Sequence, residues 1–224
     1  MGRTFAIGDI HGCYLTFKKL LFEVLAVSTE DTIYLLGDFI DRGPHTKKVL
    51  KLLLKMKSMG FNVKPIMGNH EIMLLGSIFS PLKFQGWMRS GGQATLNSFE
   101  VEHPANIKDK YIDFITNLPF LYETDEFILV HGGLNFDAEN PLEEFESMPW
   151  IRNATFDKSK IGNRRILVGH TPSTLERIYN SLNEDRILLD GGCVFINSNK
   201  ELGNLVALEI DNWKLHTQKC IDFE

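Results

Sequence analysis

The sequence predicts an α/β fold built on parallel strands, and three observations support this prediction. Short apolar runs stop at small-residue loops six times along the chain. Two stretches between the first three runs have apolar residues at helical spacing. The balance of 43% hydrophobic and 24% charged positions over 224 residues is that of an ordinary soluble globular protein with ample material for a core. Because no repeat, low-complexity stretch or linker interrupts the chain, we expect a single domain over residues 1–224.

Residues 3–67 are expected to form a β-α-β-α-β unit. The three apolar runs occupy residues 5–7, 33–36 and 63–67. Between them, apolar residues stand at positions 17, 20, 21, 24 and 25 and at positions 49, 52, 53 and 56. This i, i+3, i+4, i+7 stripe is typical of a helix packed on a sheet. Right-handed crossovers would make the three strands parallel.

The second half of the chain is less regular. We expect a helix at residues 109–117 and strands around residues 127–131, 165–169, 186–190, 205–210 and 213–219. A second, more antiparallel sheet is the expected arrangement for these strands.

Each apolar run is followed by a loop with a metal-binding side chain. The loops contain Gly8-Asp9-Ile10-His11-Gly12, Gly37-Asp38-Phe39-Ile40-Asp41-Arg42-Gly43, Gly68-Asn69-His70-Glu71, His131, Gly169-His170 and Asp190. Ligands of α/β folds bind at the carboxyl ends of the strands, so these loops are expected to meet in one site.

The first three loops occur in order and at near-equal spacing, with 29 residues from Asp9 to Asp38 and 31 from Asp38 to Asn69. With them the sequence resembles the phosphoprotein phosphatase family of dinuclear metallophosphoesterases, and most closely its small bacterial and bacteriophage serine/threonine phosphatases. The further signatures His131-Gly132-Gly133 and Gly169-His170-Thr171 extend the resemblance over about residues 4–195. It implies a calcineurin-like metallophosphoesterase fold, in which two mixed β-sheets pack as a sandwich flanked by helices.

Carboxylate, imidazole and amide ligands suit hard to borderline divalent cations. The resemblance implies two such ions, with Mn²⁺ as the first choice and Fe²⁺ or Zn²⁺ as alternatives, and with Asp38 as the bridging carboxylate. The implied metal ligands are Asp9, His11, Asp38, Asn69, His131 and His170. Two divalent cations and two aspartates leave a local charge of about +2, which would attract a phosphate although the whole chain has a net charge of −5.

The resemblance also implies the catalytic residues. His70 is the expected general acid, and Asp41 is the expected partner that orients its ring. Arg42 is expected to bind phosphate oxygens. A second phosphate-binding arginine is expected between His131 and His170, where Arg152 is the best positional match and Arg164 and Arg165 are the alternatives. Residues 77–106 are long and weakly periodic, and we interpret them as a segment that shapes substrate choice.

Three functions are compatible with these motifs. The first is a phosphoprotein phosphatase that hydrolyses phosphoserine or phosphothreonine, with phosphotyrosine as a wider specificity, by direct attack of a metal-bridging hydroxide. Its partners would be phosphorylated proteins or peptides, and small aryl phosphates in vitro. The alternative is a symmetrical dinucleoside polyphosphate hydrolase, because bacterial enzymes of that kind share the five motifs. The third is a non-catalytic phosphate-binding module, which the intact His70 and Asp41 disfavour.

Composition excludes other classes of function. A net charge of −5 and a pI near 5.8 disfavour nucleic acid and membrane surfaces as partners. No apolar run approaches the roughly 20 residues that span a bilayer. The three cysteines are sparse and show no CxxC spacing, so the sequence suggests neither a disulfide framework nor a thiolate zinc site. We therefore expect a cytoplasmic enzyme.

Overall fold

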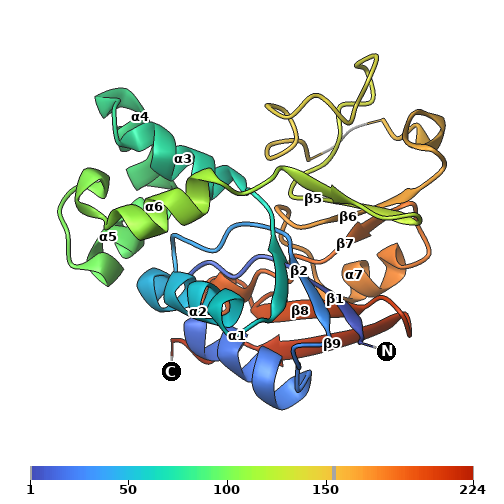
Figure 1. The fold of residues 1–224 in the computed structure, drawn as a ribbon, viewed down its shortest axis with the longest axis horizontal. Helices are drawn as coiled ribbons and strands as arrows, with labels where there is room; N and C mark the ends of the chain where they lie inside the picture. Colours follow the sequence, from blue (N-terminus) through green and yellow to red (C-terminus); the bar gives the residue numbers. More distant parts are fainter. Residues whose placement is uncertain (1, 153–154, 224) are drawn as a thin grey trace.

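The computed structural model describes residues 2–152 and 155–223 and shows two β-sheets packed face to face, with helices on their outer sides (Figure 1). One sheet has five strands in the order β3-β2-β1-β8-β9, and the other has four in the order β4-β5-β6-β7. Both sheets contain parallel and antiparallel pairs. The predicted sandwich of two mixed sheets is confirmed.

The strands follow the predicted apolar runs closely. The five-stranded sheet consists of β1 (Thr4–Ile7), β2 (Thr32–Leu35), β3 (Asn62–Pro65), β8 (Asn204–Glu209) and β9 (Lys214–Lys219). The four-stranded sheet consists of β4 (Leu121–Glu123), β5 (Phe127–Val130), β6 (Arg165–Val168) and β7 (Arg186–Leu188).

The main helices gather on one side of the sandwich (Figure 1). They are α1 (Tyr14–Lys19) with the π-helical η1 (Leu20–Val24), α2 (Thr46–Ser58), α3 (Asn69–Ser77), α4 (Pro81–Trp87), the π-helical η2 (Met88–Gly92), α5 (Gln93–Phe99) and α6 (Asp109–Thr116). Helix α7 (Leu175–Ser181) packs on the four-stranded sheet. Short 3₁₀ turns are η3 (Pro104–Asn106), η4 (Lys158–Ile161) and η5 (Cys193–Phe195).

The inner strands β1 and β8 of the five-stranded sheet are buried on both faces because their side chains alternate between two cores. Phe5 and Ile7 of β1 pack with α1 and α2, whereas Ala6 between them packs against the second sheet. Strand β8 repeats this alternation, with Leu205 and Ala207 on the helical side. The twofold alternation of side chains along a strand therefore places this sheet in the middle of the molecule.

The expected location of the antiparallel strands is wrong. Strands β8 and β9 form a hairpin, but they extend the first sheet, where β8 pairs antiparallel with β1. The second sheet is mostly parallel, because β5, β6 and β7 run in the same direction. Sequence patterns define strands but not their partners, since pairing depends on contacts between distant residues.

Residues 77–106 are largely helical instead of an irregular segment. Helices α4 and α5 are only seven residues each, and Gly86, Gly91 and Gly92 interrupt the apolar pattern that would have predicted them. None of the helices within residues 2–152 and 155–223 is long and apolar enough to cross a bilayer. The cytoplasmic location stays a prediction.

The three cysteines meet in the core, which their spacing in the sequence did not suggest. Cys13, Cys193 and Cys220 are buried free thiols whose sulfur atoms lie within 4.8 Å of one another. They come from the loop after β1, the turn η5 and the segment after β9. Their grouping is therefore a product of the sheet topology.

Candidate active site

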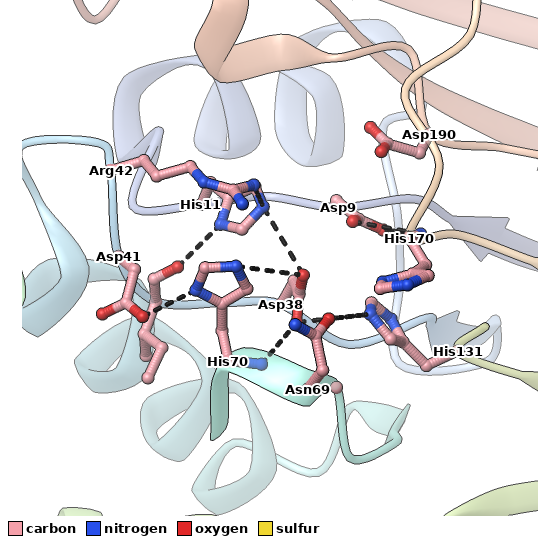
Figure 2. A network of polar contacts seen from close by, with 12 residues as sticks. Asp9, His11, Asp38, Asp41, Arg42, Asn69, His70, His131, His170 and Asp190 are labelled. Atoms are coloured by element: carbon pink, nitrogen blue, oxygen red, sulfur yellow. Dashed lines mark hydrogen bonds and ion pairs between the residues drawn. The ribbon is translucent and has the colours of Figure 1, made fainter. Parts of the chain in front are cut away.

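The predicted loops follow the carboxyl ends of β1, β2, β3, β5 and β6, and Figure 2 shows that their side chains lie together. The residues brought together there are Asp9, His11, Asp38, Asp41, Arg42, Asn69, His70, His131 and His170. Their side chains come from segments up to 161 residues apart, as in the contact between Asp9 and the His170 backbone. The parallel arrangement of strands explains this convergence, because it places successive carboxyl ends at one edge.

Several of these residues have a strained backbone. His11, Asp38, Asp41, Arg42 and His170 have φ values of 45°, 49°, 69°, 66° and 66°. This left-handed region is uncommon for residues other than glycine and costs about 1–3 kcal/mol per residue. The surrounding contacts must outweigh that cost, and such strain is concentrated at functional sites in proteins.

Asp38 lies at the centre of the site and faces two groups of histidines. Its Oδ2 is 3.5 Å from His11 Nε2 and 4.0 Å from His70 Nε2. Its Oδ1 is 3.3 Å from His131 Nε2, on the side of His170. Asp38 therefore belongs to both sets of donor atoms that could hold a cation, one with His11 and His70 and the other with His131 and His170. This is the geometry that a bridging carboxylate requires.

The position of Asp9 differs from the predicted ligand set in one respect. The side chain that completes the donor set of His11 and Asp38 is His70 and not Asp9. Both carboxylate oxygens of Asp9 instead accept a hydrogen bond from the His170 backbone N–H, at 3.0 and 3.1 Å. Asp9 is buried within the site, next to Asp190 (Figure 2).

Two of the histidines are anchored through Nδ1 on backbone carbonyls, so that Nε2 faces the site. Nδ1 of His11 lies 2.8 Å from the Ile40 carbonyl and Nδ1 of His131 lies 2.6 Å from the Leu36 carbonyl. These contacts place a proton on Nδ1. Nε2 then faces Arg42 in His11 and lies 3.0 Å from Asn69 Oδ1 in His131. Nε2 of His170 is buried and has no hydrogen-bond partner among the described residues. The lone pair of such an unpaired nitrogen would bind a cation.

The protonation of these histidines follows from burial and from their neighbours. Burial and the charge of His131 lower the pKa of His170 to about 3, and burial and the charge of His70 lower the pKa of His11 well below its usual range. Both rings are therefore neutral, as metal ligands must be. Burial also opposes the charged form of His131, but the charge of Asp38 prevails and raises the pKa of His131 to about 10. A bound cation would replace that proton.

Three buried carboxylates lie close together at the site. Burial and the charge of Asp190 raise the pKa of Asp9 well above its usual range, and burial raises the pKa of Asp190 to about 6. Buried carboxylates are costly without a compensating cation. Together with the orphaned His170 Nε2 and the shared Asp38, they show that the residues present fit divalent cations.

Glu71 holds the loops that carry Asp38 and Asn69. Its carboxylate accepts hydrogen bonds from the backbone N–H groups of Asp38, Phe39 and Gly68, at 3.0, 2.8 and 3.1 Å. A side chain at Gly68 would collide with Asp38, since a Cβ there would lie 2.2 Å from Asp38 Oδ1. Glycine and glutamate in this motif thus bring two strand ends into contact.

The Asp41 carboxylate has three donors, two of which the sequence analysis did not identify. Its Oδ2 accepts from His70 Nδ1 at 2.7 Å and from Trp87 Nε1 at 2.8 Å. Its Oδ1 accepts from Thr95 Oγ1 at 2.7 Å. Gly92 lets the Trp87 ring approach, because a Cβ at Gly92 would lie 2.5 Å from that ring. In the sequence, the only signal for these two donors is the run from Trp87 to Thr95, which contains Gly91 and Gly92.

Arg42 reaches into the site from the same loop. One guanidinium nitrogen lies 2.6 Å from His11 Nε2, and the guanidinium stacks over Phe195 at 5.3 Å from the ring centre. The Arg42 backbone N–H donates to the Gly91 carbonyl at 3.1 Å. A cation on His11 would displace the guanidinium from Nε2 and leave its donors free for an anionic ligand.

The structure separates the three candidates for the second arginine. Arg152 donates to the His170 carbonyl at 3.0 Å and therefore lies at the site. Arg164 pairs with Glu123, and Arg165 donates to the carbonyls of Leu182 and Glu184. Both therefore lie at the amino end of β6, away from the site. Arg152 is the candidate that geometry favours.

The chain resembles proteins of known family and fold. A model of the calcineurin-like phosphoesterase family matches residues 2–199. A symmetrical bis(5'-nucleosyl)-tetraphosphatase from Proteus mirabilis (strain HI4320) is 32% identical over 133 residues, which cover 58% of this chain and 44% of that protein. The match thus covers less than half the length of this curated relative. Further bacterial relatives carry the same description.

Two solved structures show the same fold at low sequence identity. A provisionally assigned diadenosine tetraphosphatase aligns with a TM-score of 0.70 and 19% identity over 99% of this chain and 95% of that one. A protein serine/threonine phosphatase from Saccharomyces cerevisiae aligns with a TM-score of 0.68 and 15% identity over 100% of this chain and 81% of that one. At such identities these structures support the fold alone.

The curated relatives overturn the predicted function and partners. Hydrolysis of phosphoserine or phosphothreonine, with phosphorylated proteins or peptides as partners, is the wrong prediction, because the relatives at 29–32% identity are named tetraphosphatases. They favour the alternative substrate class. The five motifs could not make this distinction, since they supply metal ligands and phosphate contacts that both reactions need.

The site residues and the matched region agree with each other. The family model covers every predicted metal ligand, and two groups of His and Asp donor atoms share Asp38. This chain therefore belongs to the calcineurin-like phosphoesterase family.

Proposed function

We propose that this chain is a symmetrical dinucleoside polyphosphate hydrolase, which cleaves a dinucleoside tetraphosphate at its central P–O–P bridge into two nucleoside diphosphates. Water supplies the oxygen for one product, and the other product leaves with the bridging oxygen and takes up a proton. The observation that supports this chemistry is the Asp38 carboxylate shared between two donor groups, with the His70–Asp41 pair beside it. The curated relatives support the choice of substrate.

We further propose that Asp9, His11, Asp38, Asn69, His131 and His170 hold two divalent ions, with Mn²⁺ as the first choice. When bound, such ions polarise the phosphoryl group and lower the pKa of water. Arg42 and Arg152 lie on opposite sides of the ligand cluster, at His11 and His170. Both guanidinium groups can donate hydrogen bonds to phosphate oxygens and balance the charge of the polyphosphate chain.

His70 is proposed to donate the proton that the leaving phosphate takes up. Its Nδ1 is held by Asp41, which leaves Nε2 directed toward the Asp38 side of the site. The Asp41 carboxylate stabilises the protonated ring and fixes its orientation. Because Asp41 is fully buried and accepts from Trp87 and Thr95 as well, it has little freedom to move.

Product analysis tests the proposed function. Purified protein with Mn²⁺ is incubated with diadenosine tetraphosphate, and the nucleotides are separated by chromatography. The expected product is ADP alone, with an oxygen from labelled water in half of the ADP molecules. Equal amounts of AMP and ATP would contradict symmetrical cleavage, and tight substrate binding with no product would support a non-catalytic phosphate-binding module instead.

The role of His70 is tested by His70→Asn. We expect turnover to fall by about 10²- to 10⁴-fold, the usual size of a general-acid contribution. The metal content should stay near that of the wild type, because His70 is not among the six proposed ligands, although its ring nitrogen lies in the donor group with His11 and Asp38. A loss of metal in His70→Asn would make His70 a ligand instead of the acid. The measurements are steady-state kinetics and elemental analysis of the same preparation. Full activity of the variant would remove His70 from the mechanism.

A further inference from the structure

A cavity of about 770 Å³ lies beside the active site, between α3, α4 and the segment that precedes Arg152. Its walls are mainly apolar and aromatic, formed by Met67, Ile72, Met73, Trp87, Phe120 and Trp150. Lys83 carries the single charge and Ser90 the single hydroxyl among the described residues that line it. This size and composition are typical of a pocket for a small organic ligand.

The cavity borders the active site at three places. Met67 directly precedes Gly68 and the proposed ligand Asn69. Trp87 lines the cavity and also donates its indole N–H to Asp41 at 2.8 Å. Trp150 stands two residues before Arg152, which contacts the His170 backbone at 3.0 Å. When the phosphates of a ligand lie at Asp38, the rest of the ligand would therefore lie next to the cavity.

We infer that this cavity holds a nucleobase of the substrate while the attached phosphates lie at the active site. The identity of the nucleotide rests on the proposed function. Trp150 is 45% exposed although it is a large aromatic residue, so a ring face is available for stacking. Every nucleobase offers a planar face that stacks on an aromatic side chain. Lys83 at the rim provides a cation for the negatively charged ligand.

The inference gives residues 77–106 a defined part in substrate choice. Lys83, Gly86, Trp87 and Ser90 form one wall of the cavity, and all four belong to α4 and η2. Trp87 separates the cavity from the Asp41 carboxylate. The same segment would thus position the His70–Asp41 pair on one side and a base on the other.

Gly86→Leu tests the inference by filling the cavity. A Cβ at Gly86 meets no atom within 4 Å, so the new side chain has room and should extend into the cavity. The matched control is Gln85→Leu, which puts the same side chain on an exposed position of α4 that does not line the cavity. Thermal unfolding shows whether both variants fold like the wild type.

The readout is the affinity of Mn²⁺-loaded protein for ADP and for inorganic pyrophosphate, measured by calorimetry. ADP has a ribose and a base and pyrophosphate has neither, so the ratio of the two affinities gives what the nucleoside contributes, and the change in that ratio on substitution of Trp150 gives the part that stacking of the base provides. We expect the wild type and Gln85→Leu to prefer ADP. Trp150→Ala should reduce that preference by about 5- to 150-fold, the factor that base stacking on one aromatic ring provides. Gly86→Leu should reduce it as well, and Trp150→Phe should retain most of it.

The outcomes separate the inference from the proposed function. If the wild type shows no preference for ADP, or if Gly86→Leu and Gln85→Leu keep the same preference, the inference is overturned while tetraphosphate hydrolysis can stand. If the preference is present and lost as expected but no tetraphosphate is cleaved, the proposed function fails and the base site stands. A change in self-association of Gly86→Leu with unchanged ADP binding would assign the cavity to a second copy and overturn the inference.

Discussion

Asp38 and Asp41 are three residues apart, yet their surroundings suit opposite tasks. The oxygens of Asp38 face imidazole nitrogens at 3.3–4.0 Å, and Oδ1 accepts one hydrogen bond, from the His70 backbone N–H at 3.1 Å. The oxygens of Asp41 already accept from His70, Trp87 and Thr95 at 2.7–2.8 Å. Asp38 therefore has coordination sites left for a cation, whereas Asp41 serves to hold a neighbouring ring.

Asp38→Asn should weaken metal binding more than about 100-fold, because an amide offers one neutral oxygen where two ions share a carboxylate. The measurement is the number of ions per chain after dialysis. Asp41→Asn is the matched control, since it makes the same chemical change three residues away on a carboxylate outside the donor groups. Retention of two ions by Asp38→Asn would contradict its bridging role.

Thr95→Val should reduce turnover by about 10- to 100-fold, the range found when an outer hydrogen-bond partner of an active site is removed. The valine has the same shape but no hydroxyl, so it leaves Asp41 Oδ1 without its donor. Thr95→Ser keeps the hydroxyl and should keep most of the rate. Equal kinetics of the two variants would show that the Thr95 hydroxyl does not support Asp41.

At the scale of elements, an ion pair between the buried Asp31 and the partly exposed Arg3 connects the start of β1 to the turn before β2. Asp31 accepts from the backbone N–H of Arg3 and of Ser28 at 2.8 Å each, and from the Arg3 guanidinium at 2.8 Å. Burial opposes the charged form of Asp31, but these hydrogen bonds prevail and lower its pKa to about 2. The charged carboxylate thereby stabilises the parallel pairing of β1 with β2.

The stabilisation by Asp31 should depend on pH with a defined sign. The pKa of the folded state is depressed, so the contribution is fully present above the unfolded value of about 3.9 and is lost as pH falls toward about 2. Asp31→Asn should lower the free energy of unfolding by about 1.5–3 kcal/mol at pH 7. The gap to the wild type should narrow in denaturant titrations below pH 4.

Asp185→Asn is the control for this prediction. Asp185 pairs with Lys158 at 2.7 Å, but its side chain is 47% exposed, so its loss should matter much less. Equal effects of Asp31→Asn and Asp185→Asn at pH 7 would contradict the stabilising role of the buried Asp31 carboxylate.

At the scale of the whole molecule, the site joins the two sheets. Asp9 and Asp38 follow strands of the five-stranded sheet, whereas His131 and His170 follow strands of the four-stranded one. A cation that binds residues from both sheets binds only the assembled sandwich. It would also relieve the repulsion among the buried carboxylates Asp9, Asp38 and Asp190, which is unfavourable for folding.

Chelation should therefore lower thermal stability as well as activity. Ions present at about 100 times their dissociation constant add about 2.7 kcal/mol to the folded state. For a chain of this size that corresponds to a loss of about 5–10 °C in Tm when EDTA removes them. Scanning calorimetry of the wild type with and without EDTA provides the measurement, and Asp38→Asn should respond weakly. An unchanged Tm and an unchanged rate after EDTA dialysis would refute a metal site.

The sequence by itself determined the α/β fold, the three-strand parallel unit and the residues that meet at its edge. Each of these depends on local information, because an apolar run followed by a polar loop identifies both a strand and the side chain at its end. For that reason the sequence could be used to predict the six proposed ligands, and with them His70, Asp41 and Arg42. The resemblance built on them correctly indicated a metallophosphoesterase and the sandwich. Its narrower part, a likeness to serine/threonine phosphatases, is not supported, because the curated relatives are named tetraphosphatases.

Only the tertiary structure decided the features that depend on distant contacts. The placement of β8 beside β1, the choice of Arg152 over Arg164 and Arg165, and the support of Asp41 by Trp87 and Thr95 each join segments that no local pattern connects. The motifs did not predict the substrate, because the residues that bind metal and phosphate are shared across the family. The cavity between α4 and Trp150, where a base would lie, exists only after the chain has folded.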